Sequence, residues 1–111
     1  MHPIPIALAL LALAAGQACA ADTIQTIPAG ARLAATCTGC HGSNGVTAGT
    51  ALPSLAGQTR ENLLASLQAF KSGARPATIM AQITKGYSDE QLSQLAAYFS
   101  TQKAPNAGER P

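Results

Sequence analysis

The sequence predicts one small all-α domain. Apolar residues recur at spacings of three and four along the central and C-terminal segments, which is the pattern of a helix with one buried face. No segment alternates apolar and polar residues for long enough to indicate a strand. Gly, Pro and Ser separate the helical segments, and a chain of 111 residues suffices for a single domain.

Residues 1–20 indicate a secretory signal peptide. An apolar run is followed by the triplet Ala-Cys-Ala, which fits the small-x-small site that signal peptidase cuts. The alternative is a retained membrane anchor, but the apolar run is short for a membrane span. A second alternative is a lipoprotein signal, in which Cys19 is acylated. Lipoprotein signals usually carry a larger aliphatic residue three positions before the cysteine, where this chain has Gly16. Cleavage after Ala20 predicts a periplasmic domain of residues 21–111 with no membrane span.

The domain begins with a predicted helix over residues 30–40, whose apolar residues share one face. Residues 42–57 are rich in Gly, Ser, Thr and Ala, a composition that breaks regular structure and predicts a loop. A second helix starts after Thr59, a good N-cap, and runs to about Lys71, before Gly73 ends it. Its apolar face comprises Leu63, Leu64, Leu67 and Phe70.

Two further helices complete the expected order. Residues 77–83 predict a short helix, which Gly86 ends. Ser88 with Gln91 is a capping-box pattern, and the last helix is expected to run from there to about Gln102. Its apolar side comprises Leu92, Leu95, Ala96 and Phe99.

Cys37, Cys40 and His41 form the motif C-x-x-C-H, which is typical of covalent c-type haem attachment. On a helical turn these three side chains project to one side. The two thiols are then placed to form thioethers with the haem vinyl groups, and the imidazole to bind the iron as its proximal ligand. Attachment of this kind occurs outside the cytoplasm, in agreement with the predicted signal peptide.

Three other interpretations of the motif compete with one covalent haem c. A structural zinc site needs four ligands, whereas the mature chain offers only these two cysteines and one histidine. A thioredoxin-like redox pair requires a βαβ setting, and no strand is predicted. A plain disulfide between Cys37 and Cys40 leaves His41 unexplained.

Met80 is the candidate for the sixth position on the iron. It is the only methionine left after signal removal, and no histidine follows His41. Methionine opposite histidine raises the reduction potential, as suits an electron carrier. A lysine ligand and an open position remain alternatives, and Met80 is then an ordinary core residue.

The order of CTGCH, a loop, a helix, P-x-x-x-M and a last helix ending in LAAYF resembles class I c-type cytochromes of the short bacterial monohaem type. The resemblance implies an all-α class I cytochrome c fold, with three to four helices wrapped around one covalent haem. Such a protein is an electron carrier and not an enzyme by itself. In that fold a small residue such as Gly30 lets the first helix cross the last one, near Tyr98.

Two loop residues acquire roles from the same resemblance. Pro53 resembles the proline whose carbonyl oxygen accepts a hydrogen bond from the proximal imidazole, a bond that orients the ring and tunes its basicity. Leu55 resembles a residue of the haem environment that packs on the ring. For Pro53 the alternative is a simple turn former, whereas for Leu55 packing in the core and packing on the haem are the same prediction.

The stretch 73–92, GARPATIMAQITKGYSDEQL, resembles the cytochrome subunit of flavocytochrome c sulfide dehydrogenase. The resemblance implies a cytochrome subunit that accepts electrons from an FAD-containing flavoprotein or another redox protein. Such subunits commonly carry two haems, whereas the one C-x-x-C-H motif of this chain predicts a single-haem version. A free, diffusible monohaem carrier in a respiratory chain is the alternative. The net charge of +2 is too small to indicate nucleic-acid binding, and the five acidic residues form no recognisable catalytic pair.

Overall fold

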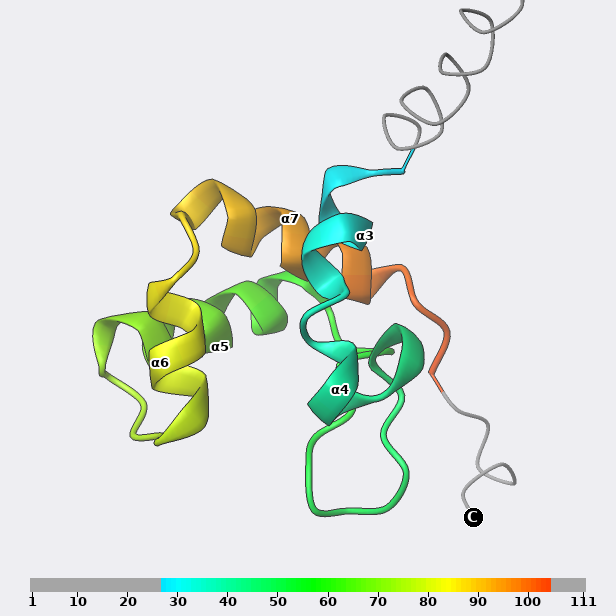
Figure 1. Cartoon of the computed structure of the whole chain (residues 1–111), viewed down its shortest axis with the longest axis horizontal. Coiled ribbons are helices and arrows are strands. Elements are labelled where there is room, and N and C mark those ends of the chain that lie inside the picture. The colour runs from blue at the N-terminus through cyan, green and yellow to red at the C-terminus, as the bar shows by residue number, and fades with distance from the viewer. Residues whose placement is uncertain (1–26, 105–111) are drawn as a thin grey trace, which may run out of the picture.

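The computed structural model describes residues 27–104, so the predicted signal peptide lies outside the described residues. The described part folds into α-helices and one 3₁₀ turn without a strand, which confirms the all-α prediction (Figure 1). The elements in chain order are α3 (Ala29–Ala34), α4 (Thr38–His41), η1 (Ser43–Gly45), α5 (Arg60–Ser72), α6 (Ile79–Lys85) and α7 (Asp89–Ser100).

The helix predicted over residues 30–40 is divided into α3 and α4. The backbone N–H groups of Ala35 and Cys37 reach back only three residues, to carbonyl oxygens at 3.4 and 2.9 Å, so a tight turn separates the two helices. The Thr36 hydroxyl also donates to the Leu33 carbonyl oxygen at 3.0 Å. Side-chain bonds of this kind compete with helical pairing, and the Thr-Cys-Thr run is a poor helix former.

The ends of α5 match the predicted caps. Thr59 Oγ1 accepts a hydrogen bond from the backbone N–H of Asn62 at 3.2 Å, which satisfies one of the free donors of the first turn. Gly73 ends the helix at a φ of 81°, in the left-handed region that favours glycine. The helix therefore begins and ends where its local sequence indicates.

The capping box of α7 is also confirmed. Ser88 Oγ accepts from the N–H of Gln91 at 3.1 Å, while the Gln91 side chain accepts from the N–H of Ser88 at 2.8 Å. The preceding helix α6 covers residues 79–85, two residues later at each end than predicted, and closes before Gly86. Boundaries of short helices are the least sharply encoded feature of a sequence.

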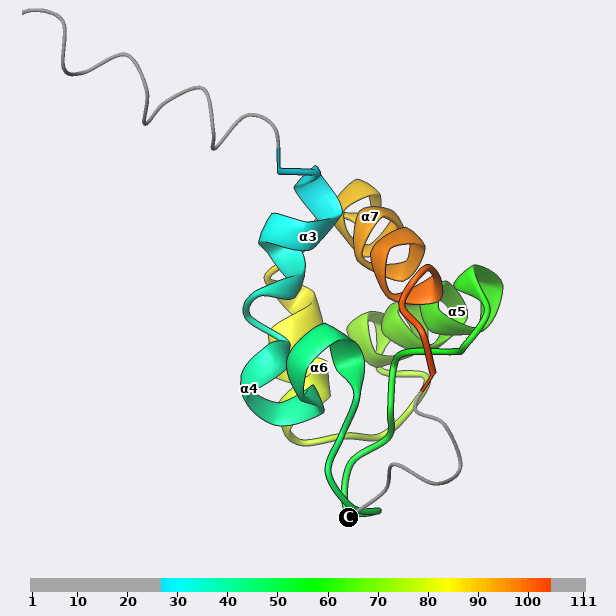
Figure 2. The ribbon, with the colours of Figure 1, turned by 90° about the vertical axis from the view of Figure 1, so that its right-hand side faces the viewer.

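The core lies where α7 packs against both α3 and α5 (Figures 1 and 2). A Cβ atom at Gly30 of α3 would stand 2.6 Å from the Gln94 carbonyl oxygen and 3.0 Å from Tyr98 Cβ. Only glycine therefore allows α3 and α7 to approach this closely. The buried core cluster consists of Ala34, Leu63, Leu92, Leu95, Ala96 and Phe99. No helix within residues 27–104 has the length and apolar content needed to cross a bilayer.

Candidate haem site

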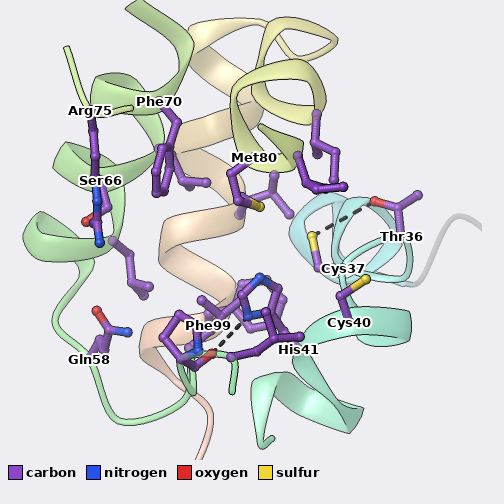
Figure 3. A pocket seen from close by; sticks show the side chains of 18 residues that line it. Thr36, Cys37, Cys40, His41, Gln58, Ser66, Phe70, Arg75, Met80 and Phe99 are labelled. Atoms are coloured by element: carbon purple, nitrogen blue, oxygen red, sulfur yellow. Dashed lines mark hydrogen bonds between the residues drawn. The ribbon is translucent and has the colours of Figure 1, made fainter. Parts of the chain in front are cut away.

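A cavity of about 480 Å³ opens between α4, the loop after it, α5, α6 and α7 (Figure 3). Its volume falls within the range of roughly 300–1,000 Å³ that is usual for small-molecule and cofactor sites. Most of its lining is apolar. The lining includes every residue singled out from the sequence, namely Cys37, Cys40, His41, Pro53, Leu55 and Met80.

The two cysteines of the motif stand on one side of this cavity. Cys37 is the N-cap residue of α4 and is half-buried, whereas Cys40 lies within α4 and is exposed. Both are free thiols. Figure 3 shows their sulfur atoms on the same side of the cavity, with the His41 ring further into it. Within residues 27–104, no three His, Cys, Asp or Glu side chains are grouped to hold a metal ion by themselves.

Burial raises the pKa of the Cys37 thiol. The Thr36 hydroxyl, 3.9 Å from the Cys37 sulfur, lowers this pKa, and the neighbouring Cys40 raises it again. Desolvation is the largest of these effects because a thiolate loses its hydration in an apolar cavity. Cys37 is therefore a protonated thiol at neutral pH in the chain without a cofactor.

His41 is the buried member of the motif, with 7% of its surface exposed. Its Nδ1 lies 2.9 Å from the carbonyl oxygen of Pro53. A carbonyl oxygen only accepts hydrogen bonds, so Nδ1 carries the hydrogen and donates it. Nε2 then holds the free lone pair of the neutral ring, which is the tautomer that a metal ligand requires.

The loop after α4 brings Pro53 to His41 through a glycine-dependent fold. Gly42 has a φ of 79°, and a Cβ atom there would stand 1.8 Å from the Val46 carbonyl oxygen, so no other residue fits. The Gly45 carbonyl oxygen then accepts from the N–H of Leu55 at 2.8 Å, which folds the loop back on itself. Leu55 is half-buried, packs on the core cluster and lines the cavity.

Met80 lies near the start of α6 and is half-buried. Figure 3 shows its sulfur atom facing the His41 ring from the other side of the cavity. The Thr84 hydroxyl donates to the Met80 carbonyl oxygen at 2.8 Å, and Thr84 is only 1% exposed. A partly buried hydrogen bond from a buried residue thus holds the backbone that carries the methionine.

Several lining residues were not singled out from the sequence. Thr36, Gln58, Ser66 and Arg75 add polar groups to the cavity. They come from four different segments, and no local pattern marks them as neighbours. The sequence did indicate the apolar lining, because Leu67 and Phe70 belong to the predicted apolar face of α5.

The donor set matches what a c-type haem requires. Two thiols lie on one side, and an imidazole and a thioether face each other across an otherwise apolar space. The thiols can bond to the haem vinyl groups, the imidazole and the thioether are ligands that haem iron accepts, and apolar walls suit a flat macrocycle.

Comparisons with known proteins agree with this chemistry. A family model for cytochrome c matches residues 27–103. The chain is 35% identical over 74 residues to the cytochrome subunit of sulfide dehydrogenase from Chlorobaculum tepidum, covering 67% of this chain and 66% of that protein. It is 36% identical over 111 residues to cytochrome c4 from Azotobacter vinelandii, covering 92% of this chain and 52% of the relative.

A shorter relative is cytochrome c-554(548) from Halomonas halodenitrificans, at 37% identity over 71 residues, which covers 61% of this chain and 86% of the relative. The chain spans less than two thirds of the length of each of the first two relatives. A cytochrome c domain binds haem c covalently and carries electrons, and it is not an enzyme by itself. The chain, with its all-α class I fold, belongs to the cytochrome c family.

Proposed function

We propose that this protein is a periplasmic electron carrier whose haem is attached through thioethers at Cys37 and Cys40. The observation that carries the proposal is the presence of both thiols, the His41 ring and the Met80 sulfur in one cavity. Bound haem supplies an iron that gains and loses a single electron. Residues 1–20 are the proposed signal peptide, which delivers the chain to the compartment where such attachment takes place.

His41 and Met80 are the proposed axial ligands. The Pro53 carbonyl oxygen, 2.9 Å from Nδ1, holds the imidazole with Nε2 free to bind iron. Met80 contributes a soft thioether, which favours the ferrous state and raises the reduction potential. With both residues bound to it, the iron would have no free coordination position for a substrate, so the site would transfer electrons only.

Mass spectrometry of the exported protein tests the attachment. The expected mass is that of residues 21–111 plus one haem, and the haem should resist extraction by acidified organic solvent because thioethers survive that treatment. A Cys37→Ser/Cys40→Ser variant should release its haem. Thr38→Ala, between the two cysteines, is the matched control and should keep it. Extractable haem in the wild-type protein would contradict the proposal.

For the electron donor we propose a flavoprotein that contains FAD and oxidises sulfide. The support is the resemblance of the segment around Met80 to the sulfide dehydrogenase cytochrome subunit, together with a 35% identical relative of that name. The cavity edge adds a physical argument. Leu52, Ile79 and Ile83 line it and are 44%, 65% and 39% exposed, so apolar surface surrounds the place where electrons enter.

An apolar edge suits a lasting contact with a donor subunit better than a transient encounter guided by charge. Ile79→Asp should therefore slow reduction of the haem by sulfide in the presence of the flavoprotein. Ile27→Asp is the matched control, because Ile27 is 43% exposed but does not line the cavity. Equal rates for the two variants would contradict this contact.

A free diffusible carrier is the second candidate function. The observation in its favour is that the similarity to cytochrome c-554(548) covers 86% of that short protein. This chain, like a free carrier, has a single haem motif. Size-exclusion chromatography of native extract separates the candidates. A subunit should elute with a larger flavoprotein and be reduced on addition of sulfide. Elution at the mass of the chain alone, without such reduction, favours the free carrier.

A further inference from the structure

The haem cavity has a polar wall opposite its cysteines. Gln58, Ser66 and Arg75 belong to the lining, and Figure 3 shows them across the cavity from Cys37 and Cys40. The attachment and axial ligation proposed above use none of these three side chains. Gln58 Nε2 already donates to the Ser54 carbonyl oxygen at 2.7 Å, and Arg75 is exposed, so Ser66 and Arg75 are the groups that could meet a polar group of the ligand there.

Arg75 carries an unused set of hydrogen-bond donors. Its guanidinium carbon lies 4.7 Å from the centroid of the Phe70 ring, and the side chain has no hydrogen-bond acceptor within residues 27–104. No carboxylate belongs to the described cavity lining. An arginine presents five N–H donors in a planar fork whose geometry matches a carboxylate.

The other charged and titratable groups nearby are already accounted for. Cys37, Cys40 and His41 are the remaining titratable groups of the lining. On the outer side of α5, Lys71 pairs with Asp89 of α7 at 2.7 Å, away from the cavity. Arg75 is therefore the one permanent charge among the described lining residues.

The end of α5 fixes the position of Arg75. Gly73 turns the chain at a φ of 81°, and the backbone N–H of Arg75 donates to the Ala69 carbonyl oxygen at 3.0 Å. These two features fold the chain back so that the Arg75 side chain stacks on Phe70. Ser66 lies one helical turn before Phe70 on the same face of α5, and its hydroxyl has no partner within residues 27–104.

Haem carries its two vinyl groups on one half of the ring and its two propionates on the other half. We propose that Arg75 binds a haem propionate through its guanidinium, with the Ser66 hydroxyl donating a further hydrogen bond. The proposal rests on the proposed attachment at Cys37 and Cys40, because thioethers there turn the propionate half of the ring toward the opposite wall. Arg75 is thus a positioning residue for the haem.

The pairing has a consequence for the reduction potential. A guanidinium beside a carboxylate favours its ionised form, so the propionate stays charged across the neutral range and the potential changes little with pH there. Without Arg75 the propionate takes up a proton at higher pH. Ferrous haem holds that proton more tightly than ferric haem, whose extra positive charge repels it. The potential then falls as pH rises through this range.

Spectroelectrochemical titration of the holoprotein at a series of pH values tests the pairing. Arg75→Gln should shift upward the pH range over which the potential falls. Arg75→Lys keeps the charge and should restore most of the wild-type profile. Arg60→Gln is the matched control, because Arg60 is exposed and donates to Ser93 Oγ at 2.8 Å on the other end of α5.

A wild-type profile in Arg75→Gln would overturn the pairing, even if that variant unfolds more easily. In that case Arg75 has only a structural role, through its contact with Phe70. An equal shift in Arg60→Gln would overturn the pairing as well, because a general loss of charge then explains the change. Haem that organic solvent extracts from the wild-type protein contradicts the proposed attachment instead, and with it the orientation on which the pairing rests.

Discussion

The Tyr87 hydroxyl lies 2.5 Å from the Thr36 hydroxyl, although 51 positions separate the two residues in the chain. Thr36 precedes Cys37, and Tyr87 follows the helix that carries Met80. Thr36 gives its own hydrogen to the Leu33 carbonyl oxygen at 3.0 Å, so Tyr87 is the donor of the pair. This bond joins the cysteine side of the haem cavity to its methionine side.

Tyr87→Phe is expected to lower the free energy of unfolding of the holoprotein by about 1 kcal/mol, because it removes a short hydrogen bond between two distant segments without changing the packing of the ring. Urea unfolding followed by circular dichroism measures the change. Tyr98→Phe is the matched control. Its hydroxyl donates to Asn44 Oδ1 at 3.2 Å, a longer bond than the 2.5 Å bond of Tyr87, so a smaller loss is expected. Equal losses of unfolding free energy in the two variants would show that the Tyr87 bond stabilises the domain no more than the Tyr98 bond does.

The close approach of α3 and α7 at Gly30 gives a second prediction. Gly30→Ala places a methyl group 2.6 Å from the Gln94 carbonyl oxygen, so the two helices must separate. The expected cost is about 1–3 kcal/mol of unfolding free energy, as for other overpacked sites. Thermal unfolding of the holoprotein measures it. Gly39→Ala, with no atom within 4 Å of the new methyl group, should be neutral or stabilising. A Gly30→Ala protein as stable as wild type contradicts the packing.

Met80→Ala should lower the reduction potential and abolish the weak long-wavelength absorption of methionine bound to ferric iron, because the soft thioether is lost. Ile79→Ala is the control, since Ile79 lines the same cavity but supplies no donor atom. Absorption spectra of the oxidised proteins and potentiometric titration provide the measurements. An unchanged spectrum in Met80→Ala would assign the sixth position to another ligand or to none.

Helix caps were predictable from the sequence because they depend on residues three positions apart. Thr59 with Asn62 and Ser88 with Gln91 form bonds that follow directly from local order. The break between α3 and α4 was not predictable in the same way. The apolar spacing of residues 30–40 continues through the break, and the side-chain bond from Thr36 that accompanies it is visible only in three dimensions.

In the haem site, too, some features were predictable from the sequence and others were not. C-x-x-C-H and the scarcity of methionine pointed to side chains that the structure brings into one cavity, because ligand chemistry restricts the residue types. The position of Arg75 in the cavity wall and the Thr36–Tyr87 hydrogen bond were not predicted, because each depends on contacts between segments that share no sequence pattern. Arginine after a helix end is common on protein surfaces, and only its stacking on Phe70 at the cavity wall distinguishes this one.

Folding of the domain should depend on the attached haem. The helices have four to thirteen residues, and isolated helices of that length are marginal in water. Many of the apolar side chains line a cavity of about 480 Å³, so without a ligand they lack contacts on one side. Within residues 27–104 the buried core cluster comprises six residues, of which three are leucine, two are alanine and one is phenylalanine. A core of this size provides little stability to spare.

Cys37→Ala/Cys40→Ala protein should therefore lose the cooperative thermal transition and much of its helical circular dichroism. Wild-type chain produced without haem maturation is the control for the substitutions themselves, and it should behave in the same way. A cooperative transition in both haem-free proteins, close in temperature to that of the holoprotein, would show that the helices hold together without the macrocycle. Cooperative unfolding of the wild-type apoprotein alone would trace the loss to the two substitutions. Either result would mean that the cavity is a preformed receptor for haem, whereas a disordered apoprotein means that attachment at the two sulfurs drives the chain to fold.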